Sequence, residues 1–481
     1  MKIAMMTEGT YPHQFGGVSV WCDQLIRGMP EHDFHVVALV ATGVERPSWE
    51  LPANVASVVS VPLWGSGPAG RRPGRAGRRR FTPLLTELVD ALMDDSAAAP
   101  ARFGLVLREL FEYAQEESLS GAFATEEAFD EFARRWCERR PDEAPSPPSL
   151  HDVLTALQLL DHSLRALSHP PAPADVVHAV TNGLGVLPAL AVKWRHGRPL
   201  IVTEHGIYLR EQYLHARKGP YRWPVKALYL RFLHHLCALG YREAALITPG
   251  NVYNTRWERR LGARPESVKT VYNGVNPADF PAFDSEPEAP TISWVGRIDP
   301  IKDLETLIRA FALVHQVLPE ARLRLFGSPP GGREGYLRQC EELAAELGVG
   351  TATTFEGRVE NIRDAYEAGH VVVLSSLSEG FPYSVIEAMT CGRPCVATDV
   401  GGVTEAIADT GIVVPPRNPE ALSDACLVLL RDAELRKRLG VEARSRALQF
   451  FTVDQAIETF DDLYVRVAAG LVPGFPDGDG R

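Results

Sequence analysis

The chain has 481 residues, 45% hydrophobic and 23% charged, which is an ordinary composition for a globular protein long enough to form two domains. Its formal net charge of −11 argues against a general nucleic-acid-binding function. No run of about 18 or more apolar residues occurs, and the chain starts directly with a strand pattern, so we expect a protein that stays in the cytoplasm.

The N-terminal segment predicts a strand, a glycine-containing loop and a helix. Residues 2–7 are mostly apolar, Gly16 and Gly17 lie in the loop, and an amphipathic helix runs through Ile26. A double glycine between a first strand and a first helix lets the backbone approach a ligand closely, although such pairs are more often simple turns. Residues 35–40 predict the second strand.

The composition changes after the second strand. Residues 64–80 are rich in glycine and arginine and predict a mobile basic loop, either solvated or in contact with an acidic acceptor, a partner or anionic lipid. Residues 81–168 predict helices. We therefore place a helical insertion at about 66–168 within the first domain.

Alternating strands and helices then resume. His205 directly follows a strand at 199–204, at the edge where open α/β sheets bind ligands. Tyr208 and Arg210 follow in an expected loop on the acceptor side. A helix at 221–241, a strand from Ala244 and a last strand from Val268 complete a first domain over 1–276. A proline-rich acidic linker is predicted at 277–290.

The second domain, predicted at 291–450, opens with a strand that ends at Gly296. Arg297 and Lys302 follow, five residues apart, before a helix. Cations above a helix start can stabilise a leaving diphosphate as it develops charge. No Asp-x-Asp motif stands in a convincing place, and the close Cys391 and Cys395 have no matching Cys or His pair, so we expect no metal.

Residues 371–402 predict a strand, a turn, a helix and a strand. Glu379 lies in the turn and Glu387, eight residues later, lies inside the helix. The start of such a helix favours an anion such as a diphosphate. This spacing alone is common among surface glutamates.

In this context the segment resembles the retaining glycosyltransferases of family 4, which have the GT-B fold: two Rossmann-like domains facing across a cleft. The resemblance covers most of residues 245–450. It implies that Glu379 contacts the donor sugar and Glu387 holds the nucleotide ribose. The other donor-binding residues that it implies are Gly16, Gly17, Gly296, Arg297, Lys302, Arg358, Val359, Gly380, Phe381, Pro382, Tyr383 and Ser384.

The resemblance also implies the reaction: retaining transfer of a sugar from a nucleotide-sugar to a hydroxyl acceptor, by a front-face route in which the leaving phosphate helps deprotonate the acceptor. It gives catalytic roles to His205, Glu379, Arg297 and Lys302, and needs no cofactor. A helix at 451–472 is expected to cross back to the first domain, and a tail at 473–481 to be disordered.

The N-terminal sequence pattern, Glu8-Gly-Thr-Tyr-Pro followed by Gly16-Gly17 and Trp21, resembles the PelF branch of exopolysaccharide glycosyltransferases. This implies a UDP-sugar donor, a carbohydrate acceptor, and membrane-protein partners of a polysaccharide synthase at the inner membrane face. Two alternatives remain open: a GT-B-fold sugar-nucleotide epimerase, and a non-catalytic nucleotide-sugar-binding assembly subunit. The side chains identify neither the base, nor the sugar, nor the acceptor.

Overall fold

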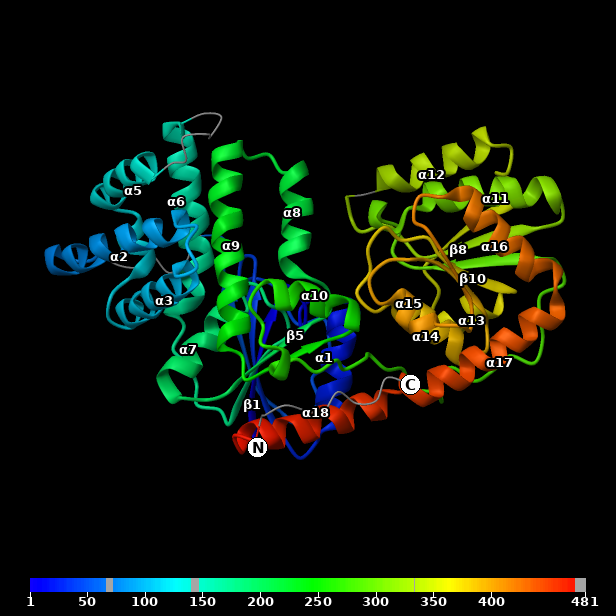
Figure 1. Ribbon diagram of the computed structural model, residues 1–481, viewed down its shortest axis with the longest axis horizontal. Coiled ribbons are helices and arrows are strands. Elements are labelled where there is room, and N and C mark those ends of the chain that lie inside the picture. The colour runs from blue at the N-terminus through cyan, green and yellow to red at the C-terminus, as the bar shows by residue number, and fades with distance from the viewer. Residues whose placement is uncertain (66–71, 140–146, 333, 472–481) are drawn as a thin grey trace. The chain divides into compact units, whose positions relative to one another are not determined.

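The computed structural model describes residues 1–65, 72–139, 147–332 and 334–471. The chain forms two compact units. The first comprises Met1–Pro249, Thr255–Thr270 and Phe460–Arg481, and the second comprises Gly250–Asn254 and Val271–Thr459. Each unit contains a six-stranded sheet with helices on both faces (Figure 1), so the predicted pair of Rossmann-like domains is confirmed.

The first sheet has the strand order β3-β2-β1-β4-β5-β6, and each neighbouring pair is parallel. The inner strands are buried on both faces, which explains why most of their residues are apolar. The strands are β1 (Lys2–Glu8), β2 (Asp33–Val40), β3 (Val55–Pro62), β4 (Val176–Ala179), β5 (Leu200–Glu204) and β6 (Leu246–Pro249).

The helices of this unit outside the insertion follow its strands in the chain. They are α1 (Gly17–Gly28), α7 (Val186–His196), α8 (Tyr208–Lys218), α9 (Trp223–Glu243), α10 (Val252–Arg260) and the 3-10 turn η2 (Pro265–Ser267). A last helix, α18 (Val453–Ala468), begins in the second unit and belongs to the first unit from Phe460 onward.

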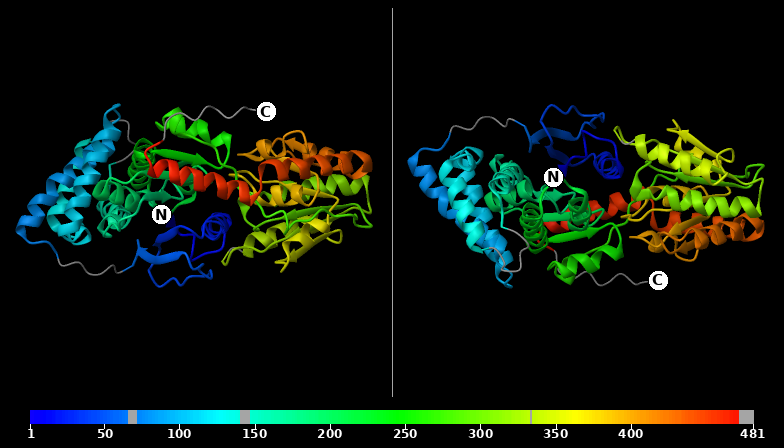
Figure 2. Two further views of the ribbon diagram at one scale, coloured as in Figure 1. Left: turned by 90° about the horizontal axis from the view of Figure 1, so that it is seen from below. Right: turned by 90° about the horizontal axis from the view of Figure 1, so that it is seen from above.

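A helical insertion lies between β3 and β4. Its elements are α2 (Arg75–Met93), α3 (Ala99–Glu116), α4 (Leu119–Phe123), α5 (Glu126–Arg139), α6 (Leu150–Leu164) and η1 (Arg165–Ser168). Phe81, Phe103 and Phe132 from the insertion belong to the same buried cluster as Val202 of β5 and Phe232 of α9. Figures 1 and 2 show the insertion helices gathered at one side of the first unit.

The second sheet has the order β12-β11-β10-β7-β8-β9, again with parallel neighbours. Its strands are β7 (Thr291–Val295), β8 (Arg322–Phe326), β9 (Thr353–Gly357), β10 (Val371–Leu374), β11 (Cys395–Thr398) and β12 (Ile412–Val414). Its helices are η3 (Pro300–Lys302), α11 (Leu304–Val317), α12 (Glu334–Glu346), α13 (Ile362–Glu367), α14 (Tyr383–Thr390), α15 (Val403–Ile407), α16 (Pro419–Arg431) and α17 (Ala433–Phe450).

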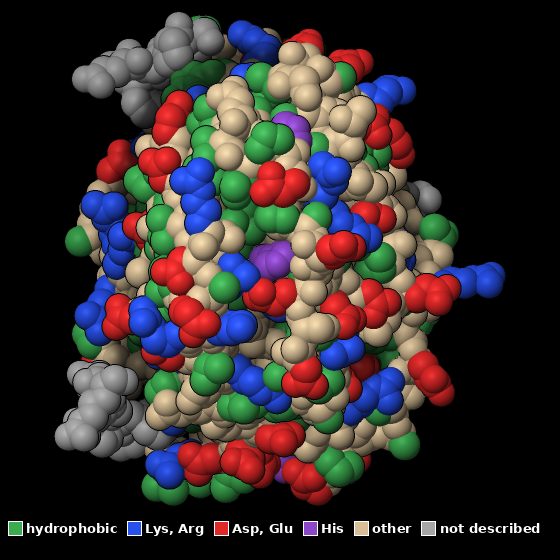
Figure 3. Space-filling view, turned by 90° about the vertical axis from the view of Figure 1, so that its right-hand side faces the viewer, with side chains coloured by type: hydrophobic (Ala, Val, Ile, Leu, Met, Phe, Trp, Pro, Cys, Tyr) green, Lys and Arg blue, Asp and Glu red, His purple; other side chains and the backbone are tan. Residues whose placement is uncertain are grey.

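Two separate hydrophobic clusters cover the two faces of this sheet. One centres on Trp294 and α11, and the other contains Tyr366 and most of α14. The face of the molecule in Figure 3 carries acidic and basic side chains interspersed over its surface. Among the described residues, no helix combines the length and apolarity that a membrane span requires.

Three expectations about local structure are wrong. Residues 75–80, predicted as part of a mobile loop, form the first turns of α2, while residues 66–71 of that loop lie outside the described residues. Tyr208 and Arg210, predicted in a loop, lie in the first turn of α8. The strand predicted from Val268 is reduced to a single bridge between Ile247 and Val268.

The division into units also differs from the predicted boundary at residue 276. Residues 271–276 belong to the second unit, where the Val275 N–H donates to the Phe451 carbonyl (2.9 Å) and the Val453 N–H donates to the Val275 carbonyl (3.0 Å). The predicted disordered tail at 473–481 lies outside the described residues.

Candidate functional site

The loop after β10 holds Glu379 beside Lys302. The Lys302 ammonium lies 2.5 Å from Glu379 Oε1, and the Ser376 hydroxyl donates to the same oxygen at 2.5 Å. Because β10 and β7 are adjacent parallel strands, the loops at their carboxyl ends meet, which joins residues 77 positions apart. Both side chains keep some exposure, 21% for Lys302 and 11% for Glu379, so a ligand can reach the pair.

Glu387 lies one turn inside α14, where the hydroxyl of the fully buried Tyr366 donates to Glu387 Oε2. Burial raises the pKa of the Glu387 carboxyl, and the hydrogen bond from Tyr366 partly offsets that effect. With one carboxyl oxygen held by Tyr366, the other is oriented and available to accept hydrogen bonds from a ligand.

The loop containing Glu379 and Gly380 rests on the backbone of Gly401 and Gly402. Gly402 N–H donates to the Gly380 carbonyl at 2.8 Å. A Cβ placed on Gly401 would lie 1.9 Å from the Glu379 carbonyl oxygen, and Gly401 has φ +57°, a conformation that side chains disfavour. The sequence analysis predicts no role for these two glycines, although a Gly-Gly pair two residues after the end of β11 indicates a close backbone approach.

The start of α14 offers backbone amides rather than a side-chain cap. Its N-cap residue, Pro382, makes no side-chain capping hydrogen bond, and the Pro382 carbonyl accepts from the Val385 N–H at 3.2 Å. Only the amides that precede Val385 can therefore point out of the helix toward a ligand. Tyr383 and Ser384 in this turn are half-buried. Phe381 differs from the rest, because its ring is buried against Tyr272 and Phe451 at centroid distances of 5.0 Å each. Only the Phe381 backbone remains for the predicted donor contact.

Gly296 ends β7 at the same sheet edge. Its N–H donates to the Phe326 carbonyl at 3.0 Å, and a Cβ on neighbouring Gly327 (φ +141°) would lie 1.7 Å from the Gly296 carbonyl oxygen. This tight backbone packing fixes the position of the chain just after β7, where Arg297 follows. Arg297 is exposed there, free to reach an anion near the start of η3.

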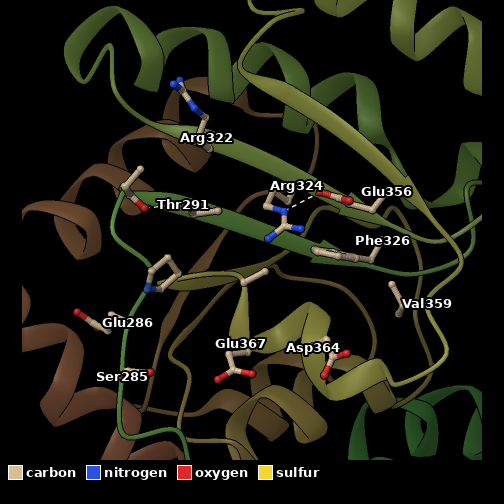
Figure 4. Close-up of a pocket in the computed structure, with 13 residues that line it drawn as sticks. Ser285, Glu286, Thr291, Arg322, Arg324, Phe326, Glu356, Val359, Asp364 and Glu367 are labelled. Atoms are coloured by element: carbon tan, nitrogen blue, oxygen red, sulfur yellow. Dashed lines mark hydrogen bonds and ion pairs between the residues drawn. The ribbon is translucent and has the colours of Figure 1, made fainter.

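Arg358 and Val359 follow β9. Arg358 is exposed, and Val359 lines a pocket of roughly 590 Å³ between β8 and α13 (Figure 4). Within this pocket Arg324 pairs with Glu356 at 2.6 Å. The lining includes neither Glu379 nor Glu387, so the pocket is separate from the carboxylates and only Val359 connects it with the predicted donor residues.

In the first unit, Gly16 is the N-cap of α1 and Gly17 is the first residue of that helix. Gly16 provides no side-chain cap, and a Cβ there would meet nothing within 4 Å. The first amides of α1 therefore border open space, which is compatible with an anion at the helix start.

His205 follows β5, as predicted, and packs edge-on against Trp21 of α1 at 4.7 Å between ring centroids. Burial lowers the pKa of His205 to about 4, so its imidazole is neutral at neutral pH. Among the described residues, its buried Nε2 has no hydrogen-bond partner. His178, by contrast, uses both ring nitrogens, Nδ1 with the Tyr464 hydroxyl and Nε2 with the Thr203 hydroxyl, each at 2.7 Å.

Three buried carboxyls of the first unit were not predicted from the sequence. Glu8 accepts from the Tyr208 hydroxyl (2.9 Å) and the Gly185 N–H (3.2 Å), and Glu204 accepts from the Tyr241 hydroxyl. Burial raises the pKa of Glu204 to about 8 and that of Glu258 to about 9, and in the described structure neither oxygen of Glu258 is hydrogen-bonded. Glu204 and Glu258 are therefore protonated near neutral pH, and burial also raises the pKa of Glu8. The residues that bury and contact these carboxyls come from distant parts of the sequence, so the sequence alone did not reveal them.

The predicted residues thus fall into two sets. The second unit brings one set to the carboxyl edge of its sheet: Gly296, Arg297, Lys302, Arg358, Val359, Glu379, Gly380, Phe381, Pro382, Tyr383, Ser384 and Glu387. Gly16, Gly17 and His205 belong to the first unit, and their contacts with a donor stay predictions. The absence of a cofactor requirement also stays a prediction.

A Lys–Glu pair and a second, partly buried glutamate thus lie at the carboxyl edge of one parallel sheet, the place where open α/β sheets bind ligands. Residues 1–266 match the family described as "Domain of unknown function (DUF3492)", and residues 289–432 match "Glycosyl transferases group 1". The first match spans more than half of the chain, so the protein belongs to the DUF3492 family, and its second unit carries a group 1 glycosyltransferase domain.

Individual proteins agree with this assignment. D-inositol 3-phosphate glycosyltransferase of Kribbella flavida is 34% identical over 206 residues, which are 39% of this chain and 49% of that protein. The chain thus spans about half the length of the curated relatives it matches.

Two solved structures share the fold. Sucrose-phosphate synthase from Thermosynechococcus elongatus has a TM-score of 0.64 at 18% identity, covering 98% of this chain and 99% of its own. Anabaena HepE in complex with UDP and glucose has a TM-score of 0.62 at 15% identity, covering 96% and 99%. The predicted GT-B fold is confirmed.

Proposed function

We propose that this protein is a retaining glycosyltransferase that moves a sugar from a UDP-sugar to a hydroxyl group of a glycan. The observation that carries the proposal is the pair of carboxylates at one sheet edge, Glu379 held by Lys302 and Glu387 held by Tyr366. Both lie within the segment that matches group 1 glycosyltransferases.

Different parts of the donor would bind different groups of the site. Lys302, Arg297 and the amides at the start of α14 would bind the diphosphate, because all of them favour an anion. Glu379, released from Lys302 but still bound by Ser376, would accept hydroxyls of the donor sugar. Glu387, with one oxygen held by Tyr366, would accept the ribose hydroxyls through the other.

In the proposed reaction the bond between the anomeric carbon and the diphosphate oxygen breaks, and the acceptor oxygen bonds to that carbon on the same face. The acceptor proton passes to the departing phosphate oxygen. The cations and helix dipole stabilise the charge on the leaving group, which is the role a metal ion has in other transferases. His205 is neutral, so it can donate or accept a hydrogen bond beside the transferring sugar.

UDP is the favoured nucleotide because HepE, which shares the fold, was solved in complex with UDP. The N-terminal segment around Gly16 and Gly17 supports a finer proposal, a PelF-type role in exopolysaccharide synthesis at the inner membrane face with membrane-protein partners. The acceptor is then a growing polysaccharide chain.

Calorimetric titration without metal tests the proposal. Wild type and Glu387→Ala are titrated with UDP, GDP and ADP, and release of UDP from UDP-sugars is followed separately. Of the three nucleotides, we expect only UDP to bind wild type. We expect the Glu387→Ala variant to bind UDP more weakly, by about 1–3 kcal/mol. Absence of nucleotide binding would refute the donor site, an epimerised sugar product would indicate an epimerase, and UDP binding without turnover would indicate an assembly subunit.

A further inference from the structure

An unusual surface lies at one end of the first unit, where the turn between α8 and α9 adjoins the start of α6 (Figure 1). We call it the helix tip and define it by Leu150, Leu154, Arg217, Lys218, Tyr221, Arg222 and Trp223. Arg222 joins its two parts, because Arg222 Nη1 lies 2.5 Å from Asp152 Oδ2 and 3.1 Å from Ser149 Oγ.

Large apolar side chains are exposed at the helix tip. The exposed fractions are 68% for Leu150, 55% for Trp223, 46% for Leu154 and 42% for Tyr221. Leu150 and Leu154 are four residues apart on one face of α6, and Tyr221 and Trp223 flank Arg222. Asp152, which pairs with Arg222, lies on the buried side of α6, so Leu150 and Leu154 line the outer side of that helix end while Tyr221 and Trp223 line the turn. Large apolar side chains exposed together at one end of the unit indicate a contact surface, since exposed apolar residues are usually scattered singly.

The same segment is strongly basic although the whole chain is acidic. No Asp or Glu occurs between Glu211 and Glu243, a stretch that includes Arg217, Lys218, Arg222 and Lys226. Arg222 is paired with the buried Asp152. Arg217 and Lys218 are exposed and form no ion pair with any residue in the described part of the chain. The helix tip therefore has positive charge available for an anionic partner.

We propose that the helix tip docks on an anionic lipid bilayer, with Trp223, Tyr221 and the two leucines at the headgroup level and Arg217 and Lys218 on the lipid phosphates. Tryptophan and tyrosine prefer this boundary because one part of each ring is apolar and the other is polar. Lysine and arginine near an anionic leaflet add attraction that salt weakens. A short turn joining two helices can reach a flat membrane.

The helix tip is distinct from the candidate site. The two share no residue, and within the first unit Tyr208 and Lys218 stand at opposite ends of α8, about 15 Å apart along the helix. The proposal therefore stands whether or not the protein transfers sugars, and nucleotide titration of the same samples distinguishes failure of one proposal from failure of the other.

The test is flotation of the full chain with vesicles of phosphatidylcholine alone and of phosphatidylcholine mixed with phosphatidylglycerol. We compare wild type with Arg217→Glu/Lys218→Glu and with Tyr221→Ser/Trp223→Ser. The matched control is Lys437→Glu/Arg438→Glu, which reverses two adjacent exposed cations on α17. The changed residues are surface side chains, and circular dichroism confirms that each variant folds.

We expect wild type and the control to float only with the anionic vesicles and to be released by added salt. Each helix-tip variant should float at least about tenfold less, and Trp223→Phe should lose a blue shift of tryptophan emission seen on binding. The proposal is overturned if wild type binds neither vesicle, if it binds both equally, or if the helix-tip variants bind as well as the control.

Discussion

The role of Glu387 can be tested with Glu387→Gln, which keeps the size of the side chain and an oxygen that accepts from Tyr366. A hydrogen bond to a charged acceptor contributes about 1.5–3 kcal/mol and one to a neutral acceptor about 0.5–1.5 kcal/mol. If Glu387 accepts from two ribose hydroxyls, loss of the charge should cost about 2–3 kcal/mol. The Kd for UDP should then rise about 30- to 150-fold.

Calorimetry with UDP, 2′-deoxy-UDP and 3′-deoxy-UDP locates that loss. The substitution should weaken binding of a deoxy nucleotide less than binding of UDP, because one of the bonds to Glu387 is already missing. Glu342→Gln, an exposed change on α12, serves as control and should bind as wild type does. An equal loss for all three nucleotides, or no loss, would show that Glu387 does not contact the ribose.

Glu387→Gln, which is expected to weaken UDP binding, should by contrast stabilise the folded protein. Burial raises the folded-state pKa of Glu387 above its ordinary value, so the folded protein holds this proton more tightly than the unfolded chain does. That contribution to stability is present at low pH and is lost as the pH rises through the folded-state pKa. At a pH above that folded-state pKa, Glu387→Gln should melt at a higher temperature than wild type. Such a result is expected when a residue serves binding at the expense of stability.

Three further predictions concern other residues. Lys302→Ala should lower release of UDP from the donor by about 100- to 1,000-fold, because a cation facing the leaving group is lost. Gly401→Ala should lower the thermal midpoint and weaken UDP binding, since the added Cβ lies 1.9 Å from the Glu379 carbonyl oxygen, whereas Gly331→Ala, which meets nothing within 4 Å, should have little effect. Wild type should melt at progressively lower temperature as the pH rises through about 9, the folded-state pKa of Glu258, and Glu258→Gln should make this pH dependence shallower.

Much of the fold was predictable because its signals are local. Runs of apolar residues predicted β1, β5, β7 and β10, since the inner strands of a parallel sheet are buried on both faces. No strand was predicted at β3, which forms an edge of the first sheet and has a mixed burial pattern. The other edge strand of this sheet, β6, is buried throughout and was predicted, so exposure of β3, rather than its edge position alone, removed the continuous apolar pattern.

The first turn of α8 shows the limit of local reasoning. Tyr208 was predicted in a loop on the acceptor side, but its hydroxyl donates to Glu8, 200 residues earlier, and its N–H donates to Glu204. A helix stabilised by contacts of such separation has little signature in its own sequence. The tertiary structure overrides the local preference.

The sequence by itself determined the positions of Glu379 and Glu387, because both lie within a single strand–loop–helix segment whose spacing can be read directly. Only the tertiary structure decided their partners, Lys302 and Tyr366, which come from other strands and helices of the second unit. The same division applies to the helix tip. The sequence shows the basic and aromatic residues, but only the contact between Arg222 and Asp152 brings their turn to the start of α6, the helix that carries the two leucines. Chain spacing is encoded locally, whereas contact between distant segments depends on how the sheets and helices pack.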